Sequence, residues 1–161
     1  IALEIDRVAL YGTGAANEPL GLHNTAGIGS EAITANNPTF AQVVNMESDV
    51  ASANALMGNL AYITGATIRG AMKVRTKDSG SGQFLWGGDN TVNGYPAFMS
   101  NQVEAGDIWF GNWSDCIIGY WSSLDLLVDP YTHSTSGTIR ITALQDVDVA
   151  FRHAASYSLG A

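Results

Sequence analysis

The feature that most constrains this chain is a β-rich segment from Phe110 to Ala155. Apolar and alternating stretches in it are separated by turn signals: Asp129-Pro130 ends one stretch, and a Thr/Ser-rich gap occupies residues 131–137. Short runs of this kind, bounded by polar turns, are typical of β-strands. The strands that we expect are Cys116 to Trp121, Leu124 to Val128, Thr138 to Ala143 and Val149 to Ala155. No residue pair in the segment is arranged for catalysis, so we expect an extended sheet that another molecule contacts.

The residues before this segment indicate helices packed on a sheet. Asn37 is the expected N-cap and Pro38 the first residue of a helix whose apolar residues recur at helical spacing as far as Met57. A strand at residues 60–64 and a helix at residues 64–75 follow it. The remaining expected elements are a helix at 2–10, a loop at 15–37, and short strands at 83–86, 97–100 and 108–110. Helix, strand and helix in this order predict an α+β fold with helices packed on a sheet.

The chain carries few charges for an ordinary soluble domain. Of its 161 residues, 46% are hydrophobic and only 14% are charged, whereas about a quarter of the residues are charged in average globular chains. A surface with few charges suits a subunit that is largely covered by its neighbours. A β-rich monomer of low charge is the alternative.

The charge balance and the cysteine content exclude several other classes. The net charge of −8 argues against a nucleic-acid-binding surface, because basic residues cluster only mildly, from Arg69 to Lys77. Cys116 is the single cysteine, which excludes an internal disulfide framework. No apolar run reaches the roughly 18 residues of a membrane span, and we expect neither a membrane partner nor a signal peptide. The chain opens with Ile1, as a fragment that begins within an element would.

We predict no catalytic, cofactor-binding or metal-binding residues. The three histidines have no metal-ligand spacing, and Cys116, the one possible nucleophile for His133 or His153, lies in an apolar strand where inert thiols are usual. Asp125 and Asp129 share one side of a strand, but solvated edge carboxylates are the simpler interpretation. The glycines of Gly12-Thr13-Gly14 follow a helix instead of a strand, so we interpret them as a helix stop and not as a phosphate loop.

Two groups of residues are predicted to matter structurally. Glycines and prolines that set turn geometry are Gly12, Gly14, Pro19, Gly21, Gly94, Pro96 and Gly111. Aromatic residues at strand spacing could form a stacking platform for sugars or bases, but a core or a subunit interface is the simpler interpretation. The candidate interface aromatics are Trp109, Phe110, Trp113 and Trp121.

Three blocks of sequence carry a resemblance to a known family. They are EIDRVALYGTG at residues 4–14 with EPLGL at 18–22, GYPAFMS at 94–100, and FGNWS at 110–114 with DVAFRHAA at 148–155. In order and spacing they resemble the C-terminal part of a tailed-bacteriophage major capsid protein of the Hong Kong 97 type. The resemblance covers nearly the whole chain.

The resemblance implies a Hong Kong 97-like capsid fold with two domains. The expected division gives residues 1–37 to the end of a peripheral-domain helix and a connecting loop. Residues 38–128 would form the axial domain, a sheet flanked by helices, and residues 129–161 the remaining strands of the β-rich peripheral domain. We expect a fragment that lacks the N-terminal arm, the extended loop and most of the spine helix of that family, and we assign no cross-linking residues.

The function that the resemblance implies is structural and not enzymatic. The full-length protein would self-assemble into pentameric and hexameric capsomers of a phage or prophage capsid. This shell would enclose double-stranded DNA without sequence-specific binding, with no cofactor, and the protein would occur in the virion capsid and, during assembly, in the host cytoplasm. The alternatives are an encapsulin-like nanocompartment shell protein and an aromatic-lined carbohydrate-binding module.

Overall fold

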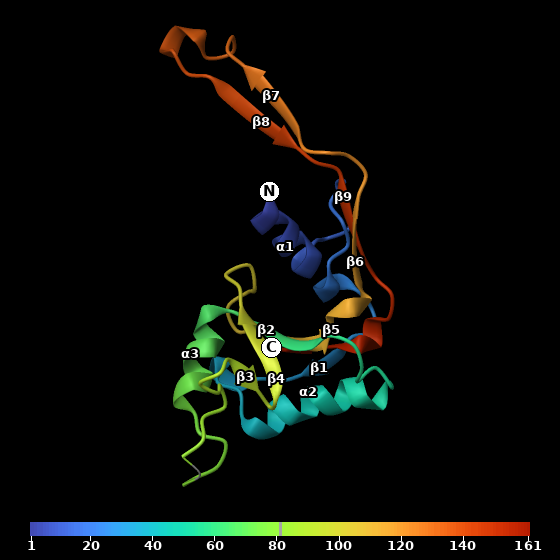
Figure 1. Ribbon diagram of the computed structural model, residues 1–161, viewed down its shortest axis with the longest axis vertical. Helices are drawn as coiled ribbons and strands as arrows, with labels where there is room; N and C mark the ends of the chain where they lie inside the picture. The colour runs from blue at the N-terminus through green and yellow to red at the C-terminus, as the bar shows by residue number, and fades with distance from the viewer. Residues whose placement is uncertain (81) are drawn as a thin grey trace.

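The computed structural model describes residues 1–80 and 82–161 and shows a compact part from which a long two-stranded part projects (Figure 1). We call the compact part the body and residues 116–151 the arm. The helices of the body are α1 (Ala2–Tyr11), α2 (Phe40–Ser52) and α3 (Ala66–Val74), with short 3-10 turns η1 (Leu22–Asn24) and η2 (Thr34–Asn36). Its strands are β1 (Gly29–Glu31), β2 (Leu60–Thr64), β3 (Thr91–Val92), β4 (Tyr95–Met99), β5 (Ile108–Asn112) and β10 (Tyr157–Gly160).

The arm consists of two consecutive antiparallel strand pairs. Strand β6 (Cys116–Tyr120) pairs with β9 (Val147–Phe151), and β7 (Asp125–Asp129) pairs with β8 (Arg140–Leu144). A 3-10 turn, η4 (Ser134–Ser136), lies at the far end. Two further 3-10 turns, η3 (Trp113–Asp115) and η5 (Ala154–Ser156), connect the arm to the body.

The body is organised around a mixed six-stranded sheet in the order β1-β10-β5-β2-β4-β3. The pairs β1–β10 and β2–β4 are parallel, and the other neighbours are antiparallel. Strand β5 lies near the middle of the sheet, and all five of its residues are buried. It therefore contributes side chains to the core on both faces.

One face of the sheet is covered by α2 and α3. Their buried residues, among them Val43, Met46 and Ile68, pack against Tyr62 and Phe110 of the sheet. The side chain of Thr39 accepts a hydrogen bond from the Gln42 N–H, and the Gln42 side chain accepts one from the Thr39 N–H, which makes a capping box at the start of α2.

The predicted N-cap of α2 was wrong by two residues. The Asn37 N–H instead donates to the Thr34 carbonyl in the preceding turn, and the Asn37 carbonyl accepts from Arg75. The helix also ends earlier than expected, at Ser52, so Met57 lies beyond it and is exposed. At α3, Ile68 and Met72 are buried as predicted.

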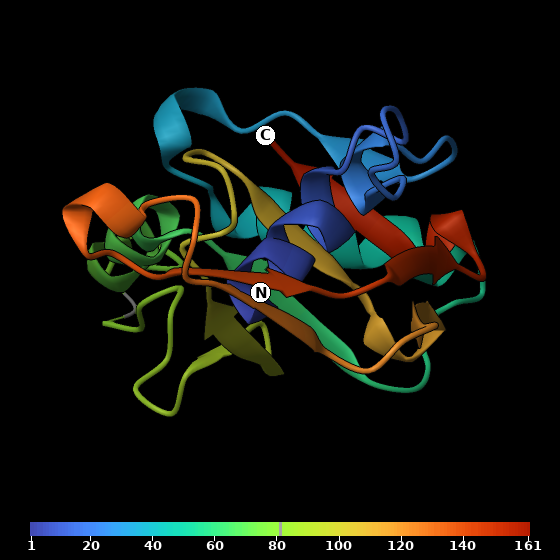
Figure 2. The ribbon, with the colours of Figure 1, turned by 90° about the horizontal axis from the view of Figure 1, so that it is seen from above.

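The other face of the sheet, nearer the arm, is covered by α1 and the loop that follows it (Figure 2). The Tyr11 hydroxyl donates to Asp107 at 2.7 Å and accepts from the Trp109 indole N–H at 3.2 Å and from the Glu104 backbone N–H at 3.1 Å. These hydrogen bonds fix the end of α1 to the segment that leads into β5. Burial, with the neighbouring Asp107 carboxylate, holds the pKa of Tyr11 well above its usual range.

The sequence analysis did not predict strands β1, β3 and β10. Strand β1 lies within the expected loop at 15–37, and β10 follows the predicted strand at 149–155, which is shorter and ends at Phe151. Residues 83–86 form no regular strand; they make isolated bridges at Phe84 and Trp86. Among the described residues, no helix has both the length and the apolar character needed to span a membrane.

Candidate functional site

The arm exposes an apolar face that no described residue of this chain covers. In the β7–β8 register Leu126 opposes Ala143 and Val128 opposes Ile141, and directly opposed residues point to the same side of a strand pair. Leu126, Val128 and Ile141 expose 58%, 57% and 67% of their surface. Ile139, two residues before Ile141, is also exposed. The arm therefore presents a continuous apolar strip to its surroundings.

The opposite face of the β7–β8 pair is mixed. Asp129 opposes Arg140 and Leu127 opposes Thr142. The Thr132 hydroxyl donates to the Asp129 carboxylate, and the Tyr131 and Thr132 backbone N–H groups donate to it at 2.9 and 3.2 Å. These hydrogen bonds, with nearby Arg140, lower the pKa of Asp129 and fix the turn at the end of β7. The face that carries Leu126, Val128 and Ile141 is therefore the more apolar of the two.

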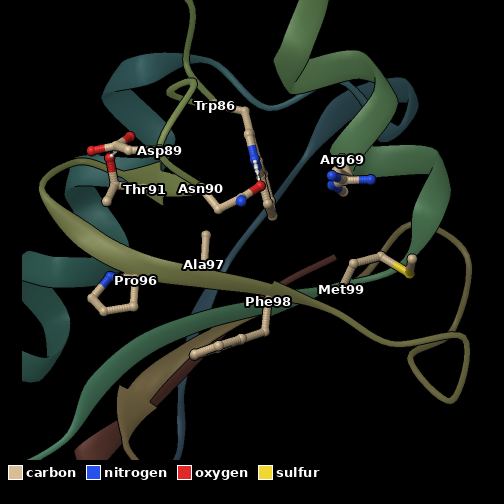
Figure 3. A pocket seen from close by; sticks show the side chains of 9 residues that line it. All are labelled: Arg69, Trp86, Asp89, Asn90, Thr91, Pro96, Ala97, Phe98 and Met99. Carbon is tan, nitrogen blue, oxygen red and sulfur yellow. Dashed lines mark hydrogen bonds between the residues drawn. The ribbon is translucent and has the colours of Figure 1, made fainter.

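One hollow of the body lies between α3 and the β3–β4 edge of the sheet (Figure 3). This open hollow of about 460 Å³ is lined by Arg69, Trp86 and Phe98, among others. The Arg69 guanidinium lies 5.3 Å from the centre of the Trp86 ring, and the Trp86 indole N–H donates to Asn90 at 3.2 Å. The Asp89 carboxylate accepts from Thr91 at 2.7 Å. These polar groups already have partners, and none is a nucleophile next to a general base.

The titratable side chains of the described residues are mostly dispersed over the fold. Within residues 1–80 and 82–161, no group of three or more His, Cys, Asp or Glu side chains lies close enough together to hold a metal ion. Cys116 is half-buried in β6, and burial raises the pKa of its thiol, which opposes thiolate formation. His153 bonds to Ser156, and neither His153 nor His133 is hydrogen-bonded to Cys116 in the part of the chain that is described.

The four candidate interface aromatics occupy different environments. Trp109 and Phe110 are fully buried on opposite faces of β5, so the structure contradicts their assignment to an interface. Successive residues of a strand point to opposite faces, and both faces of this sheet are covered here by helices or by the loop after α1. Trp113 is half-buried, and its indole N–H donates to the Ala61 carbonyl at 3.0 Å. Trp121 exposes 72% of its surface and is the one of the four that is available for contact.

Two of the predicted turn glycines allow the loop after α1 to approach the end of that helix. A Cβ atom on Gly12 would lie 2.2 Å from the Pro19 carbonyl oxygen, and one on Gly21 would lie 2.4 Å from the Gly12 nitrogen. The backbone of Gly14 donates to the same Pro19 carbonyl at 3.2 Å. This close approach places Leu22, which is fully buried, in the core beneath α1.

The other predicted turn residues differ in their surroundings. Gly94 has a positive φ of 85° in the turn between β3 and β4. Pro96 and Gly111 lie within strands and not in turns, which corrects the prediction. Pro96 opposes Thr91 in the β3–β4 pair, and Gly111 leaves room for Tyr157 of β10, whose ring would lie 2.5 Å from a Cβ atom at position 111.

The sequence analysis did not identify the uncovered face of the arm. The alternation at residues 138–143 was a usable signal, since it places Ile139, Ile141 and Ala143 on one side. A local pattern does not say whether such a face is covered within the chain. The structure supplies that information.

Comparisons with known proteins give one consistent result. The sequence model described as "Phage capsid family" matches residues 1–160. A curated protein, the major capsid protein of Halomonas phage phiHAP-1, is 39% identical over 160 residues, which are 99% of this chain and 26% of that protein. The chain thus spans about a quarter of the length of that relative.

Solved structures of several particles share the fold. The capsid of the native GTA particle superimposes with a TM-score of 0.72 at 20% identity, over 99% of this chain and 60% of the other. The virus-like particle from Pyrococcus furiosus gives 0.70 at 7% identity, over 99% and 63%. The capsid of Myoviridae phage XM1 gives 0.69 at 12% identity, over 97% and 59%. At these identities the likeness concerns the fold alone.

Proposed function

The chain belongs to the phage capsid family, and from this membership we propose that it is part of the major capsid protein of a tailed phage or prophage. The full-length protein would be a structural, non-enzymatic subunit that assembles with further copies of itself into pentameric and hexameric capsomers. Its location would be the virion capsid and, during assembly, the host cytoplasm. The chain represents only a part of that subunit.

The observation that carries this proposal is the uncovered apolar strip of the arm. A single two-stranded hairpin is marginally stable in water, and covering a large aliphatic side chain contributes about 1.5–3 kcal/mol. Leu126, Val128 and Ile141 therefore favour a state in which other protein surface lies against them. In a shell, neighbouring copies and the rest of the full-length subunit provide that surface over many small contacts.

The two parts of the structure suggest a revised division of the chain. We propose that the body corresponds to the axial domain and the arm, with α1, to the peripheral domain. The predicted axial range of 38–128 would then gain β1 and β10, which belong to the same sheet, and lose β6 and β7, which belong to the arm.

The charge of the chain fits a shell that encloses double-stranded DNA without reading its sequence. The net charge is −8, and four of the seven basic residues lie between Arg69 and Lys77. A surface with this balance holds DNA weakly, because tight binding requires many phosphate contacts. DNA in the particle would be confined by the shell.

The structure bears differently on the two alternative functions, a nanocompartment shell protein and a carbohydrate-binding module. A nanocompartment shell protein would use the same fold and the same uncovered arm. A carbohydrate-binding module is disfavoured, because Trp109 and Phe110 are inside the core and do not form a platform with Trp121.

The experiment that tests the proposal is electron microscopy of the full-length protein with charged substitutions on the two faces of the arm. We expect Val128→Asp with Ile141→Asp to abolish closed shells and to leave a folded, soluble subunit. Thr142→Asp, on the mixed face of the same strand, is the matched control and should still assemble. Shells of normal yield from the Val128/Ile141 double variant would contradict the proposal.

A further inference from the structure

The body and the arm are joined by two neighbouring connections, and each of them contains a 3-10 turn between a strand of the body and a strand of the arm. Strand β5 passes through η3 into β6, and β9 passes through η5 into β10 (Figure 1). Pairing in the sheet ends at Gly111 with Tyr157, and pairing in the arm begins at Cys116 with Phe151. Between these pairs the ladder is interrupted, although a backbone hydrogen bond of 3.0 Å crosses the gap from Arg152 N–H to the Asp115 carbonyl. We call this interrupted region the junction.

One side of the junction is fixed to the body. The Trp113 indole N–H donates to Ala61 of β2 at 3.0 Å. The Asn59 backbone N–H donates to the Asn112 side-chain oxygen at 3.1 Å and lies 3.2 Å from the Ser114 hydroxyl. Turn η3 is thus held by the residues around β2, whereas η5 contacts α2 and is joined to η3 by side chains.

A three-residue hydrogen-bonded chain connects the two turns. The buried Ser156 hydroxyl donates to Asp115 Oδ2 at 2.8 Å, and the Asn112 side-chain amide donates to the same oxygen at 3.1 Å. His153 Nδ1 lies 2.9 Å from the Ser156 hydroxyl oxygen. Ser156 has a single hydroxyl hydrogen and gives it to Asp115, so His153 Nδ1 must be the donor in this pair. That nitrogen carries a hydrogen in one neutral tautomer and in the charged form, so both can maintain the connection.

We propose that the Asp115–Ser156–His153 chain is a latch that sets the angle at which the arm leaves the body. With the ladder reduced at the gap to the bond from Arg152 N–H to the Asp115 carbonyl, the Ser156–Asp115 bond adds a second link between the two turns, and His153 orients the Ser156 hydroxyl for it. Opening the latch would free the junction to bend while the sheet of the body and the strand pairs of the arm stay formed. The use of such bending to fit arms against neighbouring copies rests on the proposed function; the latch itself does not.

The latch can be tested by amide hydrogen exchange on the unassembled full-length protein. The junction amides of Ser114, Cys116, Arg152 and Ser156 report opening, because each donates within or across the junction. We expect Ser156→Ala to raise their exchange rates about fivefold, the effect of losing one ordinary hydrogen bond. Amides of β5 in the body and of residues 117–120 of β6 in the arm should change little.

Ser158→Ala is the matched control. Ser158 is a buried serine of the same chain segment, but its hydroxyl donates to Asp49 of α2 at 3.0 Å and not across the junction. It should affect exchange near α2 and leave the junction amides unchanged. His153 is exposed, so His153→Ala should not impair folding, and it should raise the exchange rates of the junction amides about twofold. If Ser156→Ala does not fold, His153→Ala tests whether the latch holds the junction.

Two outcomes would overturn the latch. Unchanged junction exchange in both Ser156→Ala and His153→Ala would show that these bonds do not hold the junction. An equal rise throughout the body and the arm would show that Ser156 supports the fold in general. Neither result depends on shell formation, so a failure of the proposed function would leave this test intact.

Discussion

The body and the arm contain similar apolar strands but bury them in opposite ways. In the body, Phe110 and Trp109 point to opposite faces of one strand and are both fully covered within the chain. In the arm, Val128 and Ile141 oppose each other on one face and remain exposed. The body thus buries its apolar strands within the chain, whereas the arm leaves apolar side chains exposed, as a surface that other protein covers would.

The largest expected effect comes from truncating a core residue of the body. Phe110→Ala should destabilise the unassembled protein by about 3–5 kcal/mol, because it leaves a cavity under α2. Ile141→Ala, a similar truncation in the arm, should cost less than about 1 kcal/mol, since its side chain is already in water. Urea unfolding followed by tryptophan fluorescence measures both. A loss of several kcal/mol for Ile141→Ala would show that the arm is covered within the chain.

The contact between β5 and β10 tests how closely the strands of the body are packed. Gly111→Ala should cost about 1–3 kcal/mol, because the new Cβ would lie 2.5 Å from the Tyr157 ring and 2.6 Å from the Ser156 carbonyl oxygen. Gly88→Ala is the control, because nothing lies within 4 Å of a Cβ atom there. We expect the control to change the free energy of unfolding by less than about 0.5 kcal/mol in the same urea titration. Equal losses would mean that the β5–β10 contact is loose.

The hydrogen bonds that attach α1 to the sheet should contribute somewhat less to the free energy of unfolding than the β5–β10 contact. Tyr11→Phe removes the hydroxyl that donates to Asp107 and leaves the buried Trp109 indole N–H without its acceptor. We expect a loss of about 1–2 kcal/mol in thermal or chemical unfolding. Exchange at the arm amides should stay unchanged, and a faster exchange there would show that α1 also supports the arm.

The smallest effect is the pH dependence of the contact between α1 and its following loop. The Thr13 hydroxyl and Arg7 donate hydrogen bonds to Glu18 and lower the pKa of its carboxyl from 4.5 to about 2. Because this pKa is depressed in the folded state, the stabilisation is complete above pH 4.5 and is lost as the pH falls toward 2. Glu18→Gln should therefore melt at a lower temperature than the parent at pH 7 and at nearly the same temperature near pH 2.

A carboxylate of the arm provides the contrast to Glu18. The pKa of Asp129 is also lowered, by Thr132 and the adjacent backbone N–H groups, but these contacts lie within the turn after β7. Asp129→Asn should leave the melting temperature of the body unchanged at every pH. A pH-dependent shift in that variant would indicate that the two parts unfold together.

Elements with a strong local pattern could be predicted from the sequence. The strand at residues 60–64 was predicted with the bounds that the structure shows, and Cys116 to Trp121 was predicted to within one residue. Both are apolar runs bounded by turn residues. The helix before them was also predicted, but its N-cap was not, because Asn37 and Thr39 are both good capping residues and the choice between them depends on Gln42.

Features that depend on distant partners could not be predicted. Strand β1 has three residues and no apolar period, and it exists because it pairs in parallel with β10. The interface role of Trp109 and Phe110 was wrong for a related reason, because a sequence does not show which faces of a strand are covered. The hydrogen bond from Ser156 to Asp115, which crosses the junction, joins residues about forty positions apart and has no sequence signature.

The position of β10 has a consequence for synthesis. This strand lies between β1 and β5, yet it follows the whole arm in the sequence. While the ribosome makes the arm, β1 and β5 have already been made but lack the strand that joins them. The sheet can close only after residues 157–160 have emerged, so the arm is complete before the body that carries it.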